Sequence, residues 1–245
     1  MKSPKVLYQD EEIIILNKPA GWVVNRAQTV KQKTIQDWLE ENFSFPIFKE
    51  KIFRSGVVHR LDKETSGILL IAKTPFSFLE LQKQFKERKV KKKYFALVHG
   101  LVIPKEGSVK APISRSPFDR KKFGVFLGGR EAETNFKVLD YFKDEKNNYF
   151  TFLEVEPKTG RTHQIRVHLK YLGYPIVSDS FYAGRKTVRE DRKWCSRLFL
   201  QAYFLSFVHP TQKNKIEIKL PLESELKEIL KKLQKINERE IENQK

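Results

Sequence analysis

Residues 57–71 read VVHRLDKETSGILLI and place a polar segment between two apolar runs. A single carboxylate, Asp62, follows a basic pair and precedes a polar turn that ends at Gly67. Apolar residues flank the polar segment on both sides, as in a loop held between two strands. The polar residues are also ordinary turn formers, so composition alone favours a solvated turn. Loops on rigid scaffolds often carry catalytic groups, so the rest of the chain must decide between the two interpretations.

The chain is strongly basic: its 245 residues carry a formal net charge of +18. Such a field attracts polyanions, and nucleic acid is the commonest one in the cytoplasm. A lysine-rich composition without a function is the alternative, and an anionic membrane surface would require a basic amphipathic helix. The length allows a sizeable core, and we expect one catalytic domain over residues 1–245.

The sequence also indicates where the protein works. No apolar run approaches the length of a membrane-spanning helix, and the N-terminus lacks the apolar core of a signal peptide. The single cysteine, Cys195, excludes a disulfide scaffold and a thiolate metal cluster. We therefore expect a cytoplasmic protein without membrane association.

Segments rich in β-branched and aromatic residues, separated by turn formers, predict strands. The predicted strands are residues 12–17, 67–73, 94–99, 134–139, 149–156, 198–208 and 215–220. Apolar periodicity predicts helices over residues 34–42, 76–88, 162–172 and 222–240. Strands and helices do not alternate as βαβ units. We therefore expect an α+β fold with a long mixed, mostly antiparallel central sheet flanked by helices.

Residues 83–93 read KQFKERKVKKK and lead directly into Tyr94. A run of cations is usually a solvated surface. A basic run joined to aromatic residues is, however, typical of a groove that binds nucleic acid. We interpret this segment as part of such a groove.

Residues 157–169 read PKTGRTHQIRVHL and predict a turn followed by a helix that Gly173 caps. Arg161 and Arg166 would lie about 140° apart if both were helical. One is then expected to contact a backbone phosphate of the nucleic acid or to be structural, and the other to pair with a carboxylate, which the planar guanidinium binds well. His163 and His168 lack the i, i+4 spacing of helical zinc ligands, so we expect no metal site.

Four segments in this order together resemble the RluA-type pseudouridine synthases. They are KPAGWVV at residues 18–24, HRLDKETSG at 59–67, KYFALVHG at 93–100 and GRTHQIRVH at 160–168. The first motif often ends in His or Pro, where this chain has Asn25. The resemblance covers roughly residues 6–220 and implies the catalytic fold of that family, without a separate N-terminal RNA-binding module.

The resemblance also implies roles for individual residues. Asp62 would be the essential catalytic carboxylate, and Tyr94 the tyrosine that packs on the target base. Arg166 would form a salt bridge with Asp62, and Arg60 would help to extrude the uridine. The residues expected to contact the substrate are His59, Arg60, Lys91, Lys92, Lys93, Arg161 and His163.

The implied reaction breaks the glycosidic C–N bond of a uridine and forms a C–C bond at carbon 5 of the uracil. It needs neither redox change nor phosphate energy, so we expect no cofactor. A carboxylate could add to the base, attack the sugar or abstract a sugar proton, and these routes stay open. We expect a monomer that modifies ribosomal or transfer RNA. The competing hypotheses are a non-catalytic RNA-binding or RNA-folding factor and a nucleic-acid glycosylase.

Overall fold

A computed structural model describes residues 2–237 and 240–241 of the chain. It divides into two compact units, which are described separately below. The first unit comprises residues 1–92 and 202–220, and the second comprises residues 93–201 and 221–245. The single catalytic domain expected from the sequence stays a prediction.

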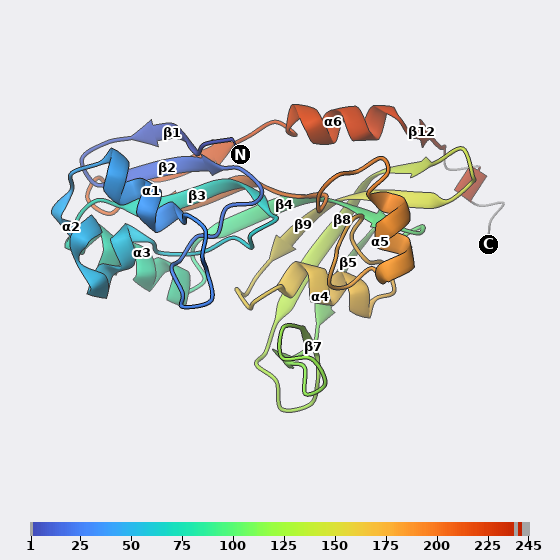
Figure 1. Ribbon diagram of the computed structural model, residues 1–245, viewed down its shortest axis with the longest axis horizontal. Coiled ribbons are helices and arrows are strands. Elements are labelled where there is room, and N and C mark those ends of the chain that lie inside the picture. Colours follow the sequence, from blue (N-terminus) through green and yellow to red (C-terminus); the bar gives the residue numbers. More distant parts are fainter. Residues whose placement is uncertain (1, 238–239, 242–245) are drawn as a thin grey trace. The chain divides into compact units, whose positions relative to one another are not determined.

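The first unit is built on a sheet in which the strand order is β1-β2-β3-β10, with β11 paired to β10 (Figure 1). The strands are β1 (Lys5–Gln9), β2 (Ile13–Lys18), β3 (Ser66–Ala72), β10 (Leu200–Val208) and β11 (Lys215–Lys219). Strands β2 and β3 pair in antiparallel register, and the apolar residues of both are buried. Their uninterrupted apolar sequences are typical of strands that are covered on both faces.

Short helices accompany this sheet: α1 (Ile35–Asn42), α2 (Pro46–Lys49), the 3-10 helix η1 (Lys51–Gly56) and α3 (Pro75–Lys86). Helix α1 begins with a capping box, in which Thr34 accepts from the Asp37 amide and the Asp37 side chain accepts from the Thr34 amide. This arrangement satisfies two backbone donors that the first turn leaves without helical partners.

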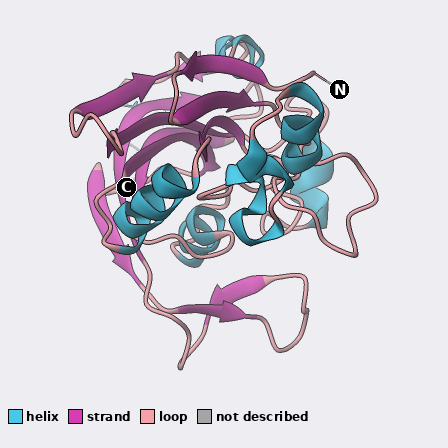
Figure 2. Ribbon diagram, turned by 90° about the vertical axis from the view of Figure 1, so that its left-hand side faces the viewer, coloured by secondary structure: helices cyan, strands magenta, loops and turns pink. Residues whose placement is uncertain are grey.

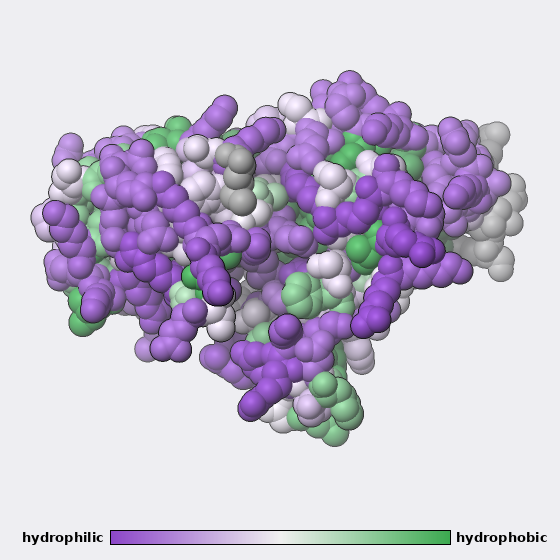
Figure 3. All heavy atoms as spheres, viewed as in Figure 1, coloured by the Kyte–Doolittle hydropathy of each residue, from purple (hydrophilic) through white to green (hydrophobic). Residues whose placement is uncertain are grey.

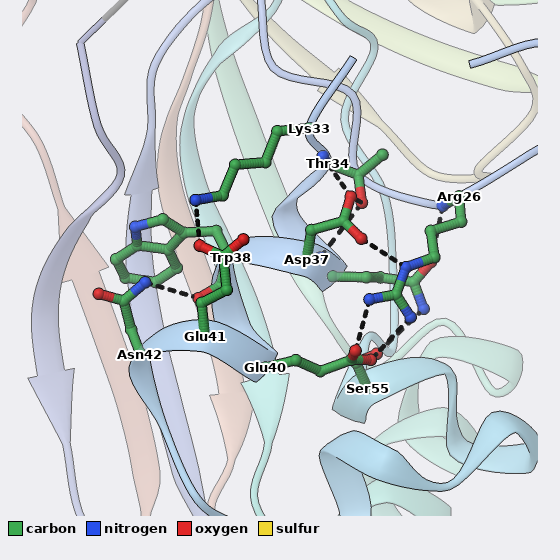
Figure 4. A network of polar contacts seen from close by, with 10 residues as sticks. Arg26, Lys33, Thr34, Asp37, Trp38, Glu40, Glu41, Asn42 and Ser55 are labelled. Carbon is green, nitrogen blue, oxygen red and sulfur yellow. Dashed lines mark hydrogen bonds and ion pairs between the residues drawn. The ribbon is translucent and has the colours of Figure 1, made fainter. Parts of the chain in front are cut away.

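A polar network fixes the loop that follows the first motif (Figure 4). The Arg26 guanidinium donates to Asp37 Oδ1 at 2.6 Å and to Glu40 Oε1 at 2.7 Å, both on α1. Glu40 Oε1 also accepts from the Ser55 hydroxyl at 2.8 Å. Ser55 has a left-handed backbone with φ 54°, which non-glycine residues adopt at a cost. The network therefore ties this loop and η1 to the same helix.

The second unit contains a sheet of order β4-β9-β8-β12, with β5 paired to β8. Its strands are β4 (Lys91–His99), β5 (Glu106–Lys110), β8 (Glu133–Lys143), β9 (Tyr149–Pro157) and β12 (Gln234–Lys235). The pairings of β4 with β9, β9 with β8, and β8 with β5 and β12 are all antiparallel. The helices of this unit are α4 (Gln164–Tyr171), α5 (Arg185–Asp191) and α6 (Ser224–Lys231).

A separate two-stranded sheet, β6 (Ile113–Arg115) and β7 (Phe123–Val125), stands apart from the other strands of the second unit (bottom of Figure 2). Phe118 and Leu127 in its loops are 91% and 101% exposed, and apolar atoms are visible at the lower end of Figure 3. The base of this hairpin packs against a small apolar cluster that includes Val167 of α4 and Tyr182.

The α+β prediction with a mostly antiparallel sheet and flanking helices is confirmed. Each predicted strand overlaps an observed one, although the ends differ by a few residues. The helix predicted over residues 222–240 is wrong in its extent. Helix α6 ends at Lys231, and Gln234 and Lys235 pair with β8 as strand β12. Within that range, residues 238–239 lie outside the described part of the chain.

Candidate active site

Asp62 lies on a loop of the first unit that leads into β3, and its side chain is partly buried. The predicted strand before this loop is wrong. The preceding residues form η1, and only Val57 makes a bridge, with Ile71 of β3. The loop therefore has a strand on one side only, while its turn is closed by the Thr65 amide donating to the Asp62 carbonyl at 3.2 Å.

Gly67 shows why the motif ends in glycine. Its φ is 116°, and an added Cβ would lie 2.1 Å from the carbonyl oxygen of Ala202 on β10. Any side chain at this position would push β10 away from β3 directly beside the loop. The chain thus passes from the Asp62 loop into the sheet at a point where only glycine fits.

Lys18, at the end of β2, binds the backbone of the same loop. Its side chain is fully buried, and the ammonium donates to the carbonyls of Pro19 and Trp22 at 3.0 Å and of Lys63 at 3.3 Å. The Lys63 carbonyl also accepts from the Gly21 amide at 2.7 Å. A buried ammonium must have its donors satisfied, and here three carbonyls serve that need. The residue after Asp62 is therefore anchored to the first motif.

The sequence did not assign this role to Lys18. The signal was the position of the lysine, since it ends a run of buried apolar residues in β2. A lysine at such a position needs acceptors close by, and the turn at residues 19–22 supplies two of them.

His59 holds the other side of the loop. Its Nε2 accepts from the Leu70 amide of β3 at 2.9 Å, and its ring stacks on Phe85 with centroids 4.8 Å apart. Burial, together with the nearby charge of Lys92, lowers the pKa of His59 from 6.5 to about 3. The imidazole is therefore neutral near pH 7, with its proton on Nδ1. The predicted substrate contact of His59 stays a prediction, whereas its contact with β3 is observed.

The predicted cationic segment contains side chains in three different environments. Lys91 is exposed, whereas Lys92 is partly buried, lies 5.9 Å above the Phe85 ring and has a pKa that burial lowers. Lys93 donates to Glu154 of β9 at 2.6 Å. Arg60, beside His59, is exposed. A cation must be accessible to contact a phosphate, and Lys91 and Arg60 are more exposed than Lys93.

Tyr94 and Arg166 belong to the second unit. Tyr94 is on β4, opposite Val155 of β9, and is 8% exposed. Arg166 is on α4, is 3% exposed, and donates from Nε and Nη2 to the two carboxylate oxygens of Asp179, both at 2.8 Å. Its predicted salt bridge with Asp62 stays a prediction. The Asp179 partner was missed. The sequence indicated a carboxylate partner for either Arg161 or Arg166, and the resemblance implied that Asp62 is the partner of Arg166.

Arg161 and His163 precede α4 rather than lie in it, because the helix begins at Gln164. The argument from their angular separation on a helix therefore does not apply to Arg161. The Arg161 Nε donates to the Glu131 carbonyl at 3.0 Å. His163 has a left-handed backbone with φ 56°, and its Nδ1 lies 2.9 Å from the Tyr182 hydroxyl.

Comparison with known proteins agrees with these features. The family model for RNA pseudouridylate synthase matches residues 12–171. The solved structure of human RNA Pseudouridylate Synthase Domain Containing 1 superposes with a TM-score of 0.74 and 25% identity, covering 98% of this chain and 94% of that chain. The architecture is that of a pseudouridine synthase.

Curated relatives lead to the same family. A Bacillus subtilis (strain 168) protein described as an uncharacterized RNA pseudouridine synthase, YlyB, is 36% identical over 94% of this chain and 73% of its own length. Ribosomal large subunit pseudouridine synthase D of Buchnera aphidicola is 37% identical over 93% of this chain and 73% of its own length. The chain belongs to the RNA pseudouridylate synthase family and is an isomerase that converts uridine in RNA to pseudouridine.

In the described part of the chain, no helix is both long and apolar enough to cross a membrane.

Proposed function

We propose that Asp62 is the catalytic carboxylate of this pseudouridine synthase, with Tyr94 and Arg166 as the other active-site residues. The observation that carries the proposal is the bracing of the Asp62 loop. Lys18 and Gly21 hold the carbonyl of Lys63, and His59 binds the amide of Leu70. A solvated turn has no need of a buried ammonium for its placement. A catalytic group does need a fixed position, because misplacement by about 1 Å can cost roughly a hundredfold in rate.

Arg60, Lys91, Lys92, Lys93, Arg161 and His163 are proposed as RNA contacts. Support for Arg60 and Lys91 comes from their exposure and charge, and support for Lys92 from its place beside the Phe85 ring. Phosphate contacts would hold the RNA while the target uridine leaves its stack. Base flipping is the proposed means of access, since a stacked base cannot reach a carboxylate on the enzyme.

The proposed target is ribosomal RNA of the large subunit, with transfer RNA as the alternative. The support is the name of the Buchnera relative, a ribosomal large subunit pseudouridine synthase. A cytoplasmic monomer is the proposed state of the enzyme. The formal net charge of +18 supports a monomer because it disfavours self-association.

The test uses large-subunit ribosomal RNA and transfer RNA made with tritium at carbon 5 of uracil. Pseudouridine formation releases tritium and leaves the RNA chain intact. A glycosylase would leave abasic sites, and a non-catalytic RNA-binding factor would release nothing. Release from ribosomal RNA but not from transfer RNA is the expected result, and release from transfer RNA alone would reverse the proposed target.

A further inference from the structure

Arg166 is held in place by residues of the loop that precedes α5. Its guanidinium binds Asp179 through two parallel hydrogen bonds, Nε to Oδ2 and Nη2 to Oδ1, both 2.8 Å long. Asp179 itself is completely buried. A bidentate pair of this kind fixes the plane of the guanidinium as well as its position.

The Asp179 carboxylate is in turn fixed by the backbone of its own loop. Its Oδ1 accepts from the amide of Phe181 at 3.0 Å and from the amide of Tyr182 at 3.2 Å. The Asp179 carbonyl accepts from the Ala183 amide at 3.0 Å, which closes the turn. The carboxylate that Arg166 binds therefore cannot rotate without breaking contacts to main-chain groups.

Two aromatic rings of the same loop lie against the guanidinium. The Arg166 Cζ is 5.2 Å from the ring centroid of Phe181 and 5.2 Å from that of Tyr182. Both distances lie within the range of a favourable cation–π contact. Together with Asp179, the rings restrict the arginine side chain to one orientation.

The Tyr182 hydroxyl connects this loop to two other segments. It accepts from the amide of Phe123 on β7 at 3.1 Å, and it lies 2.9 Å from Nδ1 of His163. Both contacts are satisfied when the hydroxyl donates to Nδ1, which places the imidazole proton on Nε2. The hydroxyl thus ties the residue that precedes α4 and the first residue of β7 to the ring that packs on Arg166.

We propose that Asp179 and Tyr182 are positioning residues for Arg166, and that the Tyr182 hydroxyl secures this position to the hairpin. The inference rests on the proposed active-site role of Arg166. A buried ion pair contributes little net stability compared with apolar residues of similar volume. The arrangement instead fixes the orientation of Arg166, because two hydrogen bonds and two aromatic rings act on its side chain.

The test compares Tyr182→Phe, which removes only the hydroxyl, with Asp179→Asn, which removes the charge. Steady-state tritium release should give a kcat lowered about tenfold for Tyr182→Phe and about a hundredfold for Asp179→Asn. The KM for RNA of Tyr182→Phe should stay close to that of the unmodified enzyme, and any fall in its melting temperature should leave the variant folded at the assay temperature. Tyr171→Phe is the matched control, because Tyr171 is 61% exposed at the end of α4 and should retain full kcat.

Three results would overturn the proposal. One is an unchanged kcat in Tyr182→Phe, and another is a kcat that falls only in proportion to the loss of folded protein. The third is a raised KM with an unchanged kcat, which would make Tyr182 a binding residue. The kcat of Asp179→Asn counts only if this variant folds. If it does not fold, the kcat of Tyr182→Phe alone tests the proposal. Arg166→Ala separates the two levels of inference: full activity in that variant would refute the role of Arg166 itself.

Discussion

Lys18 in the first unit and Arg166 in the second are both buried cations, but they are held by different partners. Lys18 in the first unit donates to three backbone carbonyls, whereas Arg166 in the second unit donates to both oxygens of one carboxylate. A lysine ammonium is a compact charge whose three donors can point in separate directions. A guanidinium is a planar fork that matches a carboxylate.

The difference shows what each cation positions. Carbonyls belong to the main chain, so Lys18 fixes the course of the backbone between the first motif and the Asp62 loop. Asp179 is a side chain fixed by its own loop, so its pairing with Arg166 fixes the orientation of a guanidinium. The burial of Lys18 thus serves to fix a loop, whereas the burial of Arg166 serves to fix the orientation of its own side chain.

Among the variants that change how these two cations are held, Arg166→Lys should have the largest effect on kcat. The charge is kept, but an ammonium cannot make the two parallel bonds to Asp179. We expect kcat to fall by roughly a hundredfold or more, with RNA affinity nearly unchanged. Tritium release and a filter-binding assay measure the two quantities, and near-normal kcat would mean that the fork geometry is irrelevant.

Lys18→Met should act on the first unit and on stability. The change leaves the buried carbonyls of Pro19 and Trp22 without the ammonium. We expect the free energy of unfolding to fall by about 3 kcal/mol, together with a loss of kcat as the Asp62 loop loosens. Urea denaturation measures the stability. Lys49→Met, at the exposed end of α2, is the control that should change little, and equal effects of the two changes would contradict the bracing role.

His59 predicts an effect on the same loop that appears only below neutral pH. Its pKa is about 3 in the folded chain and about 6.5 when unfolded, so the unfolded chain binds the proton first as pH falls. The contribution of His59 is therefore complete above about pH 6.5 and is lost progressively towards about pH 3. His59→Gln removes the titrating group, so the free energy of unfolding should fall less steeply over this window. Identical pH profiles would show that His59 does not titrate as described.

The smallest effects should distinguish two neighbouring lysines. Lys91 is exposed, while Lys93 is partly buried and donates to Glu154. Lys91→Gln should reduce the slope of log affinity against log salt by about one unit, and Lys93→Gln should reduce it by less. Equal reductions in the two variants would contradict the distinction drawn from their exposure.

Much of this fold could be predicted because its local signals agree with its packing. The apolar residues of β2 and β3 predicted buried strands, and Thr34 marked the start of α1. The C-terminal helix could not be predicted correctly. The apolar stripe from Leu222 to Ile236 suits a helix, but pairing of Gln234 and Lys235 with β8 ends it early. That pairing involves residues distant in sequence, which periodicity does not report.

The roles of the site residues stay predictions. Residue types indicated a carboxylate at Asp62 on a loop and a carboxylate partner for either Arg161 or Arg166, and the resemblance implied that Arg166 is the paired one. The partners Lys18 and Asp179 could not be predicted, because Lys18 is 45 residues from Lys63 and Asp179 is 13 residues from Arg166. Both contacts depend on how loops return to the same place, and residue types carry no such information.

The most direct test of the central claim is the turnover of Asp62→Asn. This change keeps the size of the side chain and removes its charge, and it leaves the Lys18 contacts to the loop backbone in place. Single-turnover tritium release should be abolished, while the affinity for RNA stays within about twofold of the unmodified enzyme. Pseudouridine formation at the normal rate in this variant would show that Asp62 is not the catalytic carboxylate.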